Sequence, residues 1–147
     1  MGCCLSIKLD YDLQKQNNAL NYFSFDGLKT RAKVVDIYDG DTCSIVFLYR
    51  GQFIKYRTRA YGYDTCEMHP KKNLENREQE MATAQKQKDC FANMVNYNNG
   101  LIDVELMGFD KYGRILTVYY GENKNKSINK IMVDDYGAKP YFGGTKS

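Results

Sequence analysis

Residues 32–61, AKVVDIYDGDTCSIVFLYRGQFIKYRTRAY, contain the clearest fold signal of the chain. This stretch contains three β-rich runs in succession: Ala32–Tyr38, Thr42–Tyr49 and Gln52–Tyr61. Asp39-Gly40 lies in the first connection and Arg50-Gly51 in the second. An Asp-Gly pair between two β-rich runs is a strong hairpin signal. The stretch therefore predicts a meander of three antiparallel strands.

Helix and strand signals alternate after this stretch. Residues Arg77–Val95 contain neither Gly nor Pro and predict a helix, which Asn76 can cap at its N-terminus. Its expected apolar stripe is interrupted by Lys88 and consists of Met81, Ala84, Phe91, Met94 and Val95.

Two further strands and a second helix complete the domain. The strands are expected over Leu101–Leu106 and Ile115–Tyr120, and Ser127 is expected to cap a short helix over Ile128–Asp135. The resulting order is β-β-β-α-β-β-α. Five strands with a helix between the third and the fourth is the layout of a five-stranded OB-fold barrel. Periodicity alone predicts a small β-barrel with helices, an α+β protein.

Composition limits the class of protein. The chain has 147 residues, of which 43% are hydrophobic and 27% charged, so we expect one globular domain. A net charge of +3 is compatible with a polyanionic ligand and is no argument for one. Five cysteines, an odd number, predict free thiols and a reducing compartment. A zinc site is not expected, because His69 is the one histidine and no Cys-x-x-Cys occurs.

The N-terminal sequence resembles a lipidation signal. Gly2 follows the first methionine and Ser6 lies four residues later, which fits N-myristoylation. Cys3 and Cys4 are then natural S-palmitoylation sites, and two acyl chains anchor a protein stably to a membrane. The alternative is a chance start with two small buried thiols.

The domain boundaries follow from composition. Residues 8–26 are polar without a clear period and predict a tether, with room for a short helix. We therefore expect a leader at 1–27, a folded domain at 28–143 and a tail at 144–147. An acylated leader would hold the domain at the cytoplasmic face of a membrane; otherwise a cytoplasmic protein is expected. A monomer is the default, since no exposed seam is evident.

The nine residues 59–67 combine one cation with two carboxylates. Arg59 lies near the end of a predicted strand, and Asp64 and Glu67 follow where Gly62 indicates a turn. Two carboxylates and a guanidinium at one strand end can hold a divalent cation against a phosphate. A surface salt bridge is the simpler interpretation.

Three motifs together carry a family resemblance over about residues 29–142. They are Asp39-Gly40-Asp41-Thr42, then Arg59 with Asp64-Thr65-Cys66-Glu67, then Asp110-Lys111-Tyr112-Gly113-Arg114. In order and spacing they closely resemble the staphylococcal nuclease family, and His69-Pro70-Lys71-Lys72 fits too.

The resemblance implies an OB-fold and a calcium-dependent endonuclease that acts on DNA and RNA. Single strands should be preferred, because a shallow barrel site must reach a backbone with splayed bases. The resemblance also implies one Ca²⁺ ion held by Asp41, Asp64 and the carbonyl of Thr65. Arg59 and Arg114 match the phosphate-binding arginines, and Glu67 matches the general base or water-orienting residue. Lys111 and Tyr112 match nucleotide-pocket positions, and 3'-phosphorylated products are expected. For Lys71 and Lys72, a solvated loop and a substrate contact both remain open.

Two departures from the family pattern are evident. Cys66 occupies the position where the family usually has proline, so the loop has lost one source of rigidity. The chain also ends soon after Tyr141. The competing hypothesis is a non-catalytic OB-fold module that binds nucleic acid or protein, although such degenerate domains have lost acids and arginines that this chain keeps.

Overall fold

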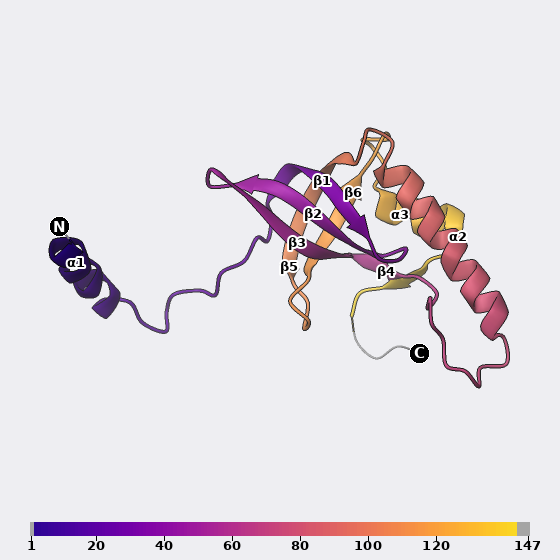
Figure 1. Cartoon of the computed structure of the whole chain (residues 1–147), viewed down its shortest axis with the longest axis horizontal. Coiled ribbons are helices and arrows are strands. Elements are labelled where there is room, and N and C mark those ends of the chain that lie inside the picture. The colour runs from indigo at the N-terminus through magenta and orange to yellow at the C-terminus, as the bar shows by residue number, and fades with distance from the viewer. Residues whose placement is uncertain (1, 144–147) are drawn as a thin grey trace.

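The computed structural model describes residues 2–143, and its centre is a closed barrel of five strands (Figure 1). The strands are β1 (Lys29–Ile37), β2 (Thr42–Tyr49), β3 (Gln52–Ala60), β5 (Leu101–Phe109) and β6 (Ile115–Tyr120). Around the barrel they follow the order β1-β2-β3-β6-β5, and β5 pairs with β1 to close it. The predicted antiparallel meander and the predicted barrel with helices are both confirmed.

The strand register brings three connections to one rim of the barrel. Thr42 at the start of β2 pairs with Arg59 near the end of β3, so the turn before β2 lies beside that end. β3 and β6 are parallel, and Arg59 pairs with Leu116 near the start of β6. The turn before β2, the end of β3 and the turn before β6 are therefore neighbours.

Two helices pack together beside the barrel, α2 (Arg77–Val95) and α3 (Ile128–Tyr136) (Figure 1). The Ser127 hydroxyl accepts a hydrogen bond from the Lys130 N–H, as predicted for a cap of α3. The predicted cap at Asn76 is wrong. Its side chain makes no capping hydrogen bond, and its φ of −107° and ψ of 30° are outside the extended region that N-caps usually adopt.

A small second sheet was not predicted. β4 (Gly62–Asp64) pairs antiparallel with β7 (Lys139–Tyr141), and Asp64 lies opposite Lys139. The sequence-based expectation placed Asp64 after a turn and gave no strand to residues 137–141. Both segments are too short to show a period, and each becomes a strand only because the other is beside it.

The barrel core is built from alternate positions of the five strands and from the inner faces of α2 and α3. Its largest side chains include Phe47, Ile102, Leu106, Phe91 and Met132, all at most 1% exposed. Phe25, which lies in the predicted leader, is also buried. Its ring packs edge-on against Phe47, Tyr49 and Tyr56, with ring centroids between 5.1 and 5.6 Å apart.

The N-terminal segment begins with helix α1 (Gly2–Gln14), where a tether with room for a short helix was expected. Figure 1 shows α1 apart from the barrel, and a segment without helix or strand joins the two. Leu5, Leu9 and Leu13, four residues apart, are all more than half exposed. Within residues 2–143, none of the helices has the length and hydropathy of a membrane span. Met1 and the predicted tail, 144–147, lie outside the described residues.

Candidate active site

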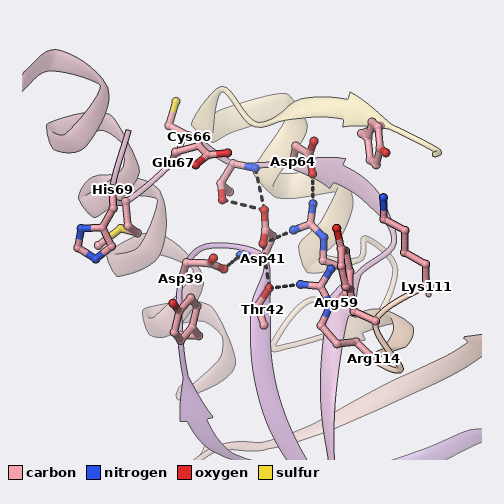
Figure 2. A pocket seen from close by; sticks show the side chains of 15 residues that line it. Asp39, Asp41, Thr42, Arg59, Asp64, Cys66, Glu67, His69, Lys111 and Arg114 are labelled. Atoms are coloured by element: carbon pink, nitrogen blue, oxygen red, sulfur yellow. Dashed lines mark hydrogen bonds and ion pairs between the residues drawn. The ribbon is translucent and has the colours of Figure 1, made fainter. Parts of the chain in front are cut away.

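The rim of the barrel holds a pocket of about 740 Å³ (Figure 2). It is open to solvent and is built from the turn before β2, the end of β3, β4 with the loop after it, the turn before β6, and β7. Eight of the residues that the family resemblance assigned line this one pocket: Asp41, Arg59, Asp64, Thr65, Glu67, Lys111, Tyr112 and Arg114. These residues lie as far apart in the chain as Asp41 and Arg114, and the closure of the barrel brings them together.

The guanidinium of Arg59 lies between two carboxylates. Its Nη1 pairs with Oδ1 of Asp41 and its Nη2 pairs with Oδ1 of Asp64, and Figure 2 shows both carboxylates turned toward it. The three side chains are only 11%, 8% and 13% exposed for Arg59, Asp41 and Asp64, respectively. A positive charge therefore already lies between the two acids in this structure.

Asp41 is held by three further hydrogen bonds. Its Oδ2 accepts from the backbone N–H of Thr65 at 2.9 Å and from the Thr65 hydroxyl at 2.8 Å, and its Oδ1 accepts from the Thr42 hydroxyl at 3.1 Å. Burial alone would raise the pKa of Asp41. The Arg59 guanidinium and these hydrogen bonds outweigh burial, so the pKa of Asp41 is lowered and the carboxylate stays ionised.

The pKa of Asp39 is shifted in the opposite direction. Its Oδ1 accepts from the backbone N–H of Asp41 at 3.0 Å, which closes the turn before β2. Burial, followed by repulsion from the Asp41 carboxylate, raises the pKa of Asp39 to about 6. The pKa values of two acids in one turn are thus shifted in opposite directions, and Asp41 is the one that keeps its charge.

Replacing Asp39 with asparagine is expected to stabilise the cation-free protein at neutral pH. The folded-state pKa of Asp39 lies above the unfolded value of 3.8, so folding favours its protonated form and stability is lost as pH rises from about 4 to 6. Allowing for solvent screening of this partly exposed group, the gain is on the order of 1 kcal/mol. Thermal unfolding at several pH values in chelator checks this, and a stability profile between pH 4 and 6 that is the same in both proteins would contradict it.

The second guanidinium is held by its own turn. Arg114 Nε donates to Asp110 Oδ2 at 2.7 Å, and Arg114 Nη1 donates to the Thr42 hydroxyl at 3.4 Å. Asp110 Oδ1 also accepts from the backbone N–H groups of Tyr112 and Arg114. Gly113, with φ of +79°, supplies the left-handed residue that this turn requires. Arg114 therefore lines the pocket from the turn just before β6, and Asp110 and Thr42 hold its side chain there.

Tyr112 and Lys111 form an exposed edge of the pocket. The Tyr112 side chain is 72% exposed, and the Lys111 ammonium and the Arg114 guanidinium lie 5.1 and 5.4 Å from the centre of its ring. An exposed ring beside two cations can stack against a base while the cations bind the phosphate of the same nucleotide.

The remaining predicted residues lie at different places. Glu67 is exposed and lines the pocket from the loop after β4. Lys71 and Lys72 are exposed and lie outside the residues that line the pocket. Cys3 and Cys4 are exposed on α1, as acylation of these thiols would require.

Sequence reasoning missed two buried side chains that hold the site together. The Tyr63 hydroxyl, in a residue with no exposed surface, donates to the Gly40 carbonyl at 2.7 Å. Gln87 of α2 accepts from the backbone N–H of Cys66 at 2.9 Å. Gln87 lies three residues after Ala84 and four before Phe91, so helical spacing alone would have placed it on the buried face.

The donor set fits one hard cation, with a small number of protein ligands. Within residues 2–143, no group of three or more His, Cys, Asp or Glu side chains is arranged to hold a metal ion. Asp41 and Asp64, however, face each other across a positive group and offer only oxygen atoms. Carboxylates, a backbone carbonyl and water are the ligands that calcium takes. The two carboxylates present therefore fit a calcium site whose remaining ligands would be a backbone carbonyl and water.

The sequence matches no protein-family model and no curated protein.

Proposed function

We propose that this chain is a calcium-dependent endonuclease of the staphylococcal nuclease family, built on an OB-fold barrel, that hydrolyses phosphodiester bonds of DNA and RNA with little sequence specificity. One observation carries the proposal: the carboxylates of Asp41 and Asp64 and the guanidinium groups of Arg59 and Arg114 line one open pocket at the barrel's rim. The strand pairing of the barrel and the three motifs in register support the family assignment.

The two carboxylates would hold the cation. Asp41 and Asp64, with the carbonyl of Thr65, are its proposed ligands. A bound calcium ion supplies Lewis acidity toward a phosphate oxygen and orients a water molecule. The lowered pKa of Asp41 keeps that ligand ionised without the ion.

The two arginines would bind the phosphate. Arg59 and Arg114 approach the pocket from β3 and from the turn before β6, and their guanidinium groups match phosphate oxygens bidentately. Charge develops on those oxygens in the transition state, so donors fixed beforehand stabilise it most. The bonds from Arg114 to Asp110 and Thr42 fix one of these two donors.

Glu67 and Tyr112 complete the assignment. Glu67, exposed on the loop after β4, is the proposed base or water-orienting group. Attack of water at phosphorus with cleavage of the P–O5' bond would leave a 3'-phosphate on one fragment and, once the 5' oxygen takes up a proton, a 5'-hydroxyl on the other. The exposed Tyr112 ring can stack only on a base that is free of its duplex partner, which favours single strands.

Digestion of single-stranded DNA, double-stranded DNA and RNA tests the function directly. Cleavage is expected with calcium, to be fastest on single strands and to vanish with a chelator. Binding without cleavage under every cation would instead support the non-catalytic OB-fold module.

The proposal extends to the location of the enzyme. Acylation of Gly2, Cys3 and Cys4 would place α1 on the cytoplasmic face of a membrane, where its exposed leucines add apolar surface.

Replacing Gly2 with alanine is expected to move most of the protein from the membrane to the soluble fraction of eukaryotic cells. The N-terminal glycine is the myristoylation acceptor, and palmitoylation of Cys3 and Cys4 depends on that first contact with the membrane. Fractionation and immunoblotting measure the shift, with Ser24→Ala as the control. An unchanged membrane fraction would remove the proposed anchor.

A further inference from the structure

A buried amide lies behind the loop that carries Glu67. Gln87 is 2% exposed within the inner face of α2, between Ala84 and Phe91, which are at most 1% exposed. Its Oε1 accepts from the Cys66 N–H at 2.9 Å, and its Nε2 donates to the Tyr136 carbonyl at 3.1 Å. A buried polar side chain is costly unless both ends are bonded. Gln87 thus links the active-site loop to α2 and to the end of α3.

The bond from Cys66 falls between two residues of the proposed site. Thr65 precedes Cys66 and donates its N–H and its hydroxyl to Asp41, while Glu67 follows Cys66 and lines the pocket. A proline at position 66 would fix its own φ and would have no N–H to donate. With cysteine at position 66, no ring restricts φ, and the backbone N–H needs a hydrogen-bond acceptor. The Gln87 amide supplies that partner.

The turn before β2 packs closely at the same place, where Gly40 leaves no space for a side chain. A Cβ added to Gly40 would lie 2.7 Å from Thr65 Cγ2 and 3.2 Å from the backbone carbon of Gln87. The turn that carries Asp41, the loop that carries Glu67 and helix α2 are therefore in direct contact. A displacement of the loop at Cys66 would pass to both Thr65 and Asp41.

We propose that Gln87 is a positioning residue: its amide fixes the backbone of Cys66, and with it Thr65 and Glu67, in place of the restriction that a proline ring would impose. The catalytic consequence rests on the proposed nuclease function, whereas the fixing of the loop does not.

Amide hydrogen exchange tests the loop directly, by NMR on the full chain. Gln87→Met keeps the length of the side chain and removes both hydrogen bonds. The Cys66 N–H is expected to exchange about tenfold faster in this variant, relative to amides inside α2, because one net hydrogen bond is lost. Gln85→Met is the matched control, since Gln85 is exposed on the same helix and bonds only Asp89 among the contacts described. Unchanged exchange at Cys66 in Gln87→Met would overturn the proposal.

Kinetics test the catalytic consequence. Gln87→Met is expected to lower kcat about tenfold with KM unchanged, because the loop is misplaced while the arginines still bind phosphate. Adding Cys66→Pro to Gln87→Met is expected to restore most of kcat, since the ring replaces the lost restraint. A loss that the proline does not relieve, in a folded protein, would overturn the positioning role.

Two further outcomes remain decisive. If wild-type protein cleaves no nucleic acid, the nuclease proposal fails, and hydrogen exchange still decides whether Gln87 holds the loop. If Gln87→Met does not fold, Gln87→Glu keeps the acceptor oxygen. Retained protection of the Cys66 N–H would then support the proposal, and its loss would overturn it.

Discussion

Replacing Arg59 with alanine is expected to lower turnover on single-stranded DNA at least a hundredfold at saturating calcium. Arg59 is the most enclosed cation of the pocket, and its guanidinium faces the place where both carboxylates converge. Removal of one fixed donor to a developing oxyanion costs about 3 kcal/mol in other enzymes. Steady-state kinetics with calcium in excess measure the effect, and Arg59→Lys should recover little because an ammonium cannot bind two oxygens in one plane.

Arg59→Ala is also expected to lower the stability of the protein in the absence of calcium. Asp41 and Asp64 would be left close together with no positive charge between them, and breaking such an enclosed pair costs about 3–5 kcal/mol. A cation that binds the two acids would return about 2.7 kcal/mol at a concentration of 100 times its Kd. The thermal stability of Arg59→Ala should therefore depend strongly on calcium, more strongly than that of the wild type.

Arg114→Ala provides the comparison. Arg114 bonds Asp110 in its own turn and is 25% exposed, so its loss should lower turnover by a similar factor with little change in stability. Near-normal turnover in both variants would remove the arginines from the mechanism. Equal calcium dependence of stability in Arg59→Ala and Arg114→Ala would contradict the role of Arg59 as an internal counter-ion.

The barrel could be predicted because its strands carry their own signals. β2 begins at Thr42 and ends at Tyr49 as expected, since Asp-Gly and Arg-Gly turns bound it on both sides. Helix α2 also has the predicted bounds, because nothing in Arg77–Val95 breaks a helix. By contrast, β4 and β7 have three residues each, and their pairing depends on a contact between residues about 77 positions apart. The residues of two such short strands show no sequence pattern that would indicate this contact.

Some features of the candidate site could likewise be predicted from the sequence, and others could not. Residue type and position singled out Arg59 and Asp64, and the family resemblance added Asp41 and Arg114; the structure places all four at one pocket. Their mutual arrangement could not be predicted, because the pairing of Arg59 with both acids follows from the closure of the barrel. Gln87 was missed for a different reason. A polar residue on a helix is normally assigned to the solvent face, and only its helical spacing indicates otherwise.

The substitution Asp41→Asn is expected to weaken calcium binding at least tenfold, which is about 1.4 kcal/mol. It removes one of two proposed anionic ligands, and calcium binds carboxylates more tightly than amides in proportion to charge. An amide also cannot satisfy the contacts of the native side chain. Both Asp41 oxygens accept hydrogen bonds, and an NH₂ group in place of either would face the N–H of Thr65 or the guanidinium of Arg59.

Titration calorimetry of the folded variant with calcium measures the loss. Asp103→Asn is the matched control, because Asp103 is 46% exposed, pairs with Arg31 and Lys124, and lies outside the pocket. Calcium affinity should be unchanged in that variant. Equal affinities in Asp41→Asn and the wild type would remove Asp41 from the ligand set, and the ion would then have to bind without an acid whose pKa Arg59 and Thr65 hold low against the effect of burial.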